Sequence, residues 1–175
     1  MTDRRLNGAI LAARVIVGLI FLLAAIDKIQ APGAFADSVR AFHILPSNLV
    51  LPFAFLVPWL ELLVAVYLLA GFMSRLAAAG SILLLLSFII ALTDSLLTGN
   101  INHACGCFGA AAGNPIVNFL ESGDRVTLWD VIRDSLLLLL SVLILLRGAG
   151  RPSIDDWLAR RRVGVPAGSR RSQSV

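Results

Sequence analysis

Both cysteines of this 175-residue chain lie in one short stretch, HACGCFG at residues 103–109. They are spaced Cys105-Gly106-Cys107, with His103 two positions earlier. A disulfide between them closes a very small ring, and ring strain raises the reduction potential. Gly106 relaxes the backbone enough to permit closure, whereas so short a loop gives little stabilisation. The spacing therefore favours a reversible, redox-active bridge, with Cys105 and Cys107 as the candidate catalytic residues.

Two other uses of the cysteines stay open. Cys-x-Cys preceded by His103 could ligate copper or zinc, but a fourth ligand would have to be His43 from another connection, so no metal is favoured. The cysteines could also be two unrelated free thiols that pack as small apolar residues. In redox use the thiolate is the nucleophile, and a nearby cation promotes that form; Lys28 and Arg133 are candidates alongside His103.

The composition places the chain in a membrane. It is 58% hydrophobic and 15% charged, with a mean hydropathy of +0.85, whereas soluble domains are about a quarter charged. Four apolar stretches are each close to the roughly 20 residues that a helix needs to cross a bilayer. We predict an all-α integral membrane fold, a four-transmembrane-helix bundle over residues 1–147, with spans at about 9–29, 49–70, 76–97 and 128–146.

The distribution of arginine predicts the orientation. Arginines precede the first span, occupy the second connection at Arg75 and recur throughout the tail, while the third connection, residues 94–134, has five acidic residues against two arginines. The positive-inside rule then places both termini in the cytoplasm and the cysteines outside, in a compartment where disulfides persist. We expect a bacterial cytoplasmic (inner) membrane protein. Residues 148–175 are predicted to form a basic, largely disordered cytoplasmic tail with affinity for membrane lipids; no nucleic acid partner is indicated.

The first outer connection is predicted to contain a short helix. Pro32 ends the first span, and Phe35, Val39 and Phe42 share one helical face. Such an amphipathic segment is expected to lie at the outer membrane interface and to end near Pro46. Further along, Thr127 and Asp130 have the spacing of a capping box at the start of the last span.

Charged residues inside the spans are expected to be paired, because isolated charges at this depth are costly. Arg14 and Glu61 are the deepest, and their estimated heights predict an ion pair, either fixing helix register or binding a polar headgroup. A second charged group collects at the outer ends of the spans: Asp27, Lys28, Asp94, Arg133 and Asp134.

Several stretches together resemble the MauE family of methylamine-utilisation membrane proteins, a branch of the DoxX-like four-helix proteins. The stretches are RVIVGLIFLLAAIDKI at 14–29, PGAFADSVRAFHILP at 32–46, PWLELLVAVYLLAG at 58–71 and CGCFG at 105–109. The resemblance implies a four-helix bundle that works with a thioredoxin-like partner in disulfide chemistry of exported proteins. The matched positions are Arg14, Lys28, Glu61, Cys105 and Cys107.

Two functions of different classes follow. The first is a thiol–disulfide oxidoreductase that exchanges with an extracytoplasmic thioredoxin-like protein and passes electrons to or from a quinone. A single cysteine pair excludes a relay within the chain. The second is a non-catalytic assembly factor, which could be one subunit of a membrane complex. The candidate cofactor-binding residues are Arg14, Lys28, Trp59, Glu61, Phe108 and Arg133.

Overall fold

The computed structural model describes residues 2–101 and 125–148, with side chains from residue 7 onward. These residues form helices, and this part of the chain contains no strand. Cys105, Cys107, Phe108 and the tail after residue 148 lie outside the described residues. The helices are α1 (Thr2–Gln30), α2 (Pro32–Ala41), α3 (Ser47–Ala70), α4 (Ser74–Thr98) and α6 (Leu128–Arg147).

Local chemistry explains where these helices begin and end. Pro32 occupies the first turn of α2, where its missing N–H costs no hydrogen bond. Gly71 ends α3 in the left-handed region at φ 67°, a conformation that glycine adopts without steric cost. The predicted capping box of α6 is confirmed, because the Thr127 N–H and hydroxyl both donate to Asp130 Oδ2 at 2.9 Å.

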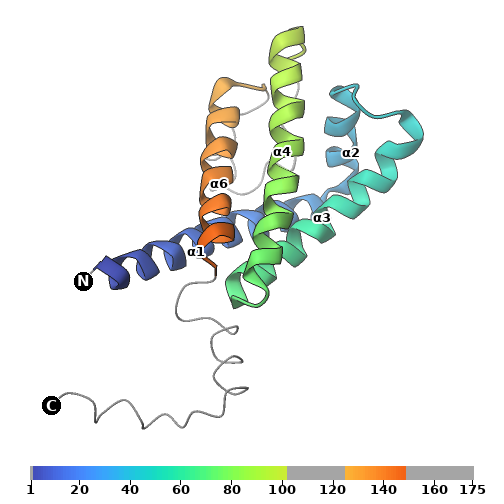
Figure 1. Cartoon of the computed structure of the whole chain (residues 1–175). Coiled ribbons are helices and arrows are strands. Elements are labelled where there is room, and N and C mark those ends of the chain that lie inside the picture. The colour runs from blue at the N-terminus through green and yellow to red at the C-terminus, as the bar shows by residue number, and fades with distance from the viewer. Residues whose placement is uncertain (1, 102–124, 149–175) are drawn as a thin grey trace, which may run out of the picture.

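The long helices pack as two close pairs that cross one another. α1 lies along α3, and α4 stands beside α6, as Figure 1 shows. α1 and α3 approach each other closely at Gly18, where an added Cβ would stand 2.9 Å from Leu69 Cγ. The main hydrophobic core draws on all four long helices, with Val17 of α1, Leu68 of α3, Leu85 of α4 and Ile144 of α6 among its members.

Apolar side chains lie on the outside of this protein and charged side chains lie inside, the reverse of the distribution in a soluble protein. Leu83 of α4 and Leu139 of α6 are 70% and 66% exposed, while charged side chains such as Lys28 and Glu61 are buried. This arrangement suits a hydrocarbon solvent. α1, α3 and α4 are long and apolar enough to cross a membrane; α6 is as long as a span but carries three charged residues in its first two turns.

The short predicted helix between the first two spans is present as α2. Phe35 and Val39 are buried on one of its faces, and they pack against Val50, Ala54 and Val57 of α3. The apolar face predicted from the sequence of this segment therefore packs against α3. In Figure 1, α2 lies beside the first half of α3, at the end of the molecule opposite the α3–α4 turn.

Candidate functional site: a buried charged cluster beside an aromatic cavity

The centre of the candidate site is an ion pair between α1 and α3. Lys28 Nζ donates to Glu61 Oε1 at 2.5 Å, and the two side chains are 0% and 1% exposed. Asp27 precedes Lys28 and is also buried. Because neither side chain of the pair reaches solvent, each depends on the other for its charge to be compensated. The pair therefore fixes the crossing of α1 and α3 and leaves a charged site inside an apolar body.

Two phenyl rings enclose the ammonium group of Lys28. Its Nζ lies 5.0 Å from the centre of the Phe35 ring of α2 and 4.8 Å from that of Phe88 of α4. Ring faces carry negative charge density, so they stabilise a cation at this distance. Lys28 consequently holds four elements together: its own helix α1, Glu61 on α3, and the rings on α2 and α4.

A second set of buried charges lies on α6. Arg133 donates through Nε and Nη2 to Asp134 Oδ1 at 3.0 and 2.9 Å, and its Nη1 lies 3.3 Å from Asp130 Oδ1. Asp130 is also the capping residue that accepts from Thr127. The capping box thus orients Asp130 and, through it, the Arg133 side chain toward the interior.

The two charged sets meet at a small cavity. Glu61 and Asp134 both lie in the wall of a cavity of about 20 Å³ where α1, α3, α4 and α6 come together. Phe88 is also in that wall, and the same ring covers Lys28. The interior of the protein therefore contains one connected polar region that runs from Lys28 through Glu61 to Asp134 and Arg133.

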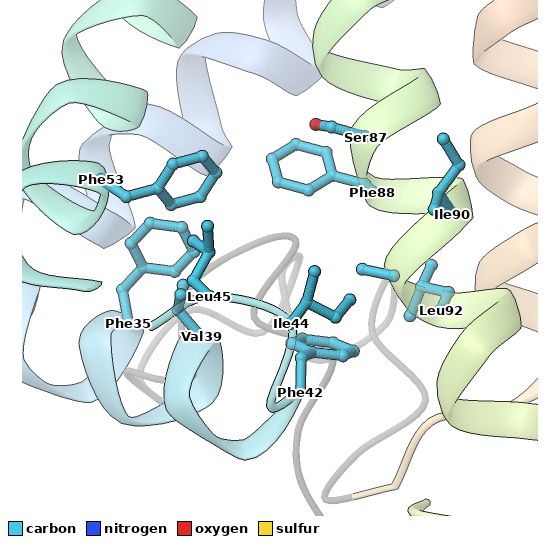
Figure 2. A pocket seen from close by; sticks show the side chains of 11 residues that line it. Phe35, Val39, Phe42, Ile44, Leu45, Phe53, Ser87, Phe88, Ile90 and Leu92 are labelled. Atoms are coloured by element: carbon cyan, nitrogen blue, oxygen red, sulfur yellow. The ribbon is translucent and has the colours of Figure 1, made fainter. Parts of the chain in front are cut away.

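A larger cavity of about 290 Å³ opens on the other side of these rings. In Figure 2, α2 and the start of α3 contribute Phe35 and Phe53 to one wall, α4 contributes Phe88 to the other, and Phe42 lies at the lower edge. Among the described residues that line it, Ser87 alone has a polar side chain, and its hydroxyl donates to Leu84 O at 2.7 Å. This aromatic cavity accepts a flat ring or an apolar chain.

The described residues on either side of the cysteine segment (residues 102–124), Ile101 and Val126, lie side by side. The Val126 N–H donates to Ile101 O at 3.1 Å, and both residues belong to a hydrophobic cluster with Ala24. Ala24 lies one turn before Lys28 on α1. The ends of the cysteine segment therefore lie at the same end of the helices as the Lys28–Glu61 pair.

A side-chain contact ties this point to α2 as well. The Asn100 amide donates to Ala41 O at 2.6 Å, which is the last residue of α2. Ile101 follows immediately, so the start of the cysteine segment is fixed beside the end of α2. Phe42, the next residue after α2, lines the aromatic cavity. The cavity, the end of α2 and the start of the cysteine segment are consequently neighbours.

The structure separates two of the predicted site residues from the others. The expected Arg14–Glu61 pair is wrong: Glu61 is paired with Lys28, which lies 14 residues, about 21 Å of helix, further along α1 than Arg14. Arg14 is buried as well, at 3% exposure. Trp59 is 58% exposed, so its side chain faces outward, away from the charged cluster. Phe108 lies outside the described residues.

Three residues of the candidate site were not predicted as site residues from the sequence. Phe35 was predicted on the apolar face of a helix at the membrane interface, and nothing local indicated that it would cover Lys28. Phe88 lies in a continuously apolar stretch, where no position stands out. Asp130 was recognised as a helix cap, and its contact with Arg133 follows from their i, i+3 spacing on one helix face, which was the available signal.

The helices and their buried charges define a multi-pass membrane protein with a polar interior. The family described as methylamine utilisation protein MauE matches residues 6–147, and the chain belongs to that family. The MauE proteins of Methylophilus methylotrophus and Methylorubrum extorquens are each 37% identical to it over 95 residues, 54% of this chain and 50% and 51% of theirs.

The MauE protein of Paracoccus denitrificans is 33% identical over 105 residues, 60% of this chain and 56% of that protein. The matches thus span about half the length of these curated relatives. No solved structure matches the chain. The recognition of the MauE family from the sequence is confirmed by these matches.

Proposed function

We propose that this protein is a membrane component of methylamine utilisation that takes part in thiol–disulfide chemistry outside the cytoplasm. Cys105 and Cys107 exchange disulfides with a thioredoxin-like partner, and a quinone occupies the aromatic cavity. The observation that carries the proposal is the position of the cysteine segment. The residues on either side of it, Ile101 and Val126, lie beside the cavity and the Lys28–Glu61 pair and are joined by a hydrogen bond.

Chain length limits how far the cysteines can lie from this site. Cys105 is four residues beyond Ile101, and four residues of chain span at most about 14 Å. Ile101 is itself packed against the cluster that contains Ala24, next to the turn that carries Lys28. This bound is compatible with direct electron transfer between the cysteines and a ring in the cavity, without a second cysteine pair.

The membrane arrangement that goes with this function has four spans, with α6 as the fourth. Leu128, Leu139 and Leu146 of α6 are each more than 60% exposed, as expected for a face in contact with lipid. The arginine-containing start of α4 lies next to the end of α6, since an atom added as Cβ on Gly148 would lie 3.6 Å from Arg75 Nε. The positive-inside rule makes this the cytoplasmic end and places the cysteines and α2 at the opposite, extracytoplasmic surface of a bacterial inner membrane.

The residues of the aromatic cavity fit the apolar parts of a quinone. Its volume is at the lower end of the range for small-molecule sites, and its phenyl rings suit offset or edge contacts with another ring. Ser87 uses its hydroxyl on the backbone, so recognition rests on shape and apolar contact. When bound, a quinone supplies an acceptor of two electrons and two protons, or, as the quinol, the corresponding donor.

This chain's own chemistry is a two-electron exchange. A thiolate of a reduced partner attacks the Cys105–Cys107 disulfide, a mixed disulfide forms, and the partner's second thiol releases it. The partner becomes a disulfide and this chain a dithiol, with two electrons and two protons transferred; the reverse sequence reduces the partner.

The test is disulfide trapping in cells that require the protein. Cys105→Ser and Cys107→Ser should each leave the helices folded, because a tiny ring contributes little stability, yet abolish function. One of the two should accumulate a mixed disulfide with a soluble thioredoxin-like protein, since the resolving thiol is missing. Purified wild-type protein in liposomes should also change thiol status on addition of quinone or quinol, measured by alkylation.

Thr93→Ala is the matched control, because it removes an exposed hydroxyl of α4 that lies outside the cavity lining, without touching a sulfur. Full complementation by both cysteine variants, with no trapped species, would show that the bridge is not catalytic. The protein would then be a non-catalytic assembly factor that holds a secreted or periplasmic partner at the membrane, alone or as a subunit of a complex.

A further inference from the structure

Glu61 and Asp134 each use only one of their two carboxylate oxygens. Glu61 Oε1 accepts from Lys28, and Asp134 Oδ1 accepts from Arg133. The other oxygen of each group, Glu61 Oε2 and Asp134 Oδ2, is buried and has no hydrogen-bond partner among the described residues; the same holds for Asp27 Oδ2. A buried carboxylate oxygen without a donor is costly, so two of them in one region indicate that something else binds there.

Both carboxyl groups lie in the wall of the same cavity. Its volume of about 20 Å³ corresponds to one water molecule, which needs at least about 10–15 Å³, and excludes any organic ligand. The two carboxyl groups supply the polar part of the wall. The remaining lining residues are apolar: Ile20, Phe21, Ala24, Leu85, Phe88 and Leu137.

The charges around this cavity do not balance within the described residues. α1 contributes Asp27 and Lys28, α3 contributes Glu61, and α4 contributes only apolar side chains to the wall. α6 contributes a cation as well, and the charged residues of α2 are exposed. Carboxyl groups outnumber cations among the buried side chains, which are Asp27, Glu61, Asp130 and Asp134 against Lys28, Arg133 and the more distant Arg14.

A buried excess of negative charge must be neutralised, and two carboxylates that share a small apolar cavity repel each other strongly. A single proton removes that repulsion, as in other sites where two carboxyl groups share one. One water molecule, with two O–H groups, completes the geometry because it can donate to one oxygen and connect it to the protonated group.

We propose that Glu61 and Asp134 together form a binding site for one exchangeable proton and one bridging water inside the membrane. The site goes beyond the proposed function and does not depend on it, since neither thiols nor a quinone take part. It makes the interior of the protein a place where a proton is held on α3 and α6, next to the Lys28 ammonium.

Infrared spectroscopy of the full chain in liposomes tests the proposal. At neutral pH the wild type should show the C=O stretch of one protonated carboxyl group, and this band should shift in heavy water because the proton exchanges. Glu61→Gln and Asp134→Asn should each abolish the band, since the remaining carboxylate retains its own cation and loses the neighbour that repelled it. Survival of the band in either variant would overturn the proposal.

Asp37→Asn is the matched control, because Asp37 is 75% exposed and bonded to Arg40 on the surface of α2; the band should persist in it. Ala24→Val tests the water without altering any charge, since Ala24 lines the cavity and two added methyl groups fill it. The band should move in that variant as the bridging water is expelled. An unmoved band, or a folded wild type without any protonated carboxyl band, would refute the site even if both amide variants failed to fold.

Discussion

Replacing the Lys28–Glu61 pair one residue at a time, and then together, gives the sharpest energetic test of this structure. The variants are Lys28→Met, Glu61→Leu and the double variant, which exchange the pair for apolar side chains of similar length. Each single change leaves a charge with no opposite partner at 0–1% exposure. The double change removes both charges and leaves an apolar contact between α1 and α3.

The magnitude follows from the cost of neutralising the remaining group. At pH 7, deprotonating a lysine of ordinary pKa costs about 4.6 kcal/mol, and protonating a glutamate of ordinary pKa costs about 3.7 kcal/mol. The remaining group can always neutralise itself, so its penalty cannot exceed these values. Each single variant should therefore lose about 3–4 kcal/mol of unfolding free energy. The double variant should lose about 1–2 kcal/mol, mainly the contacts of the Lys28 ammonium with Phe35 and Phe88.

Reversible unfolding in mixed micelles, followed by circular dichroism, measures these differences. The expected signature is a double variant more stable than either single one. Arg14→Leu with Glu61→Leu is the control cycle, and its losses should add, because Arg14 lies about 21 Å of helix from Lys28. A Lys28–Glu61 coupling energy below about 1 kcal/mol, the size of an ordinary interhelical hydrogen bond in a membrane, would refute the reasoning.

Three further predictions concern packing, the cavity and orientation. Gly18→Ala should cost up to about 1 kcal/mol in the same unfolding assay, because its Cβ would meet the Leu69 side chain at 2.9 Å and force it to move; Gly8→Ala, which meets nothing within 4 Å, should be neutral or slightly stabilising. Phe88→Ala should slow quinone-dependent thiol oxidation about tenfold, while Leu83→Ala on the exposed face of α4 should not, and equal rates would remove the quinone from the aromatic cavity. A membrane-impermeant thiol reagent should label reduced Cys105 and Cys107 in intact spheroplasts, and labelling only after permeabilisation would invert the proposed orientation.

The helices themselves could be predicted from the sequence because their signals are local. Apolar runs of span length fixed the approximate limits of α1, α3, α4 and α6. The spacing of Phe35 and Val39 identified the buried face of α2, and the spacing of Thr127 and Asp130 identified the start of α6. Each of these features depends on residues within one or two turns of each other, so no knowledge of the tertiary arrangement was required.

The composition of the charged cluster was decided only by the tertiary structure. Arg14 and Lys28 lie on the same helix, and both are cations that could have paired with Glu61. Depths counted from the helix ends favoured Arg14, because that counting sets the inner ends of the two spans at the same height. α1 and α3 instead pack side by side with Gly18 against Leu69, and this register places Lys28 opposite Glu61. The same packing brings Phe88 of α4 and Asp134 of α6 to the pair, because contacts between helices depend on their crossing angles and not on the order of residues along any one of them.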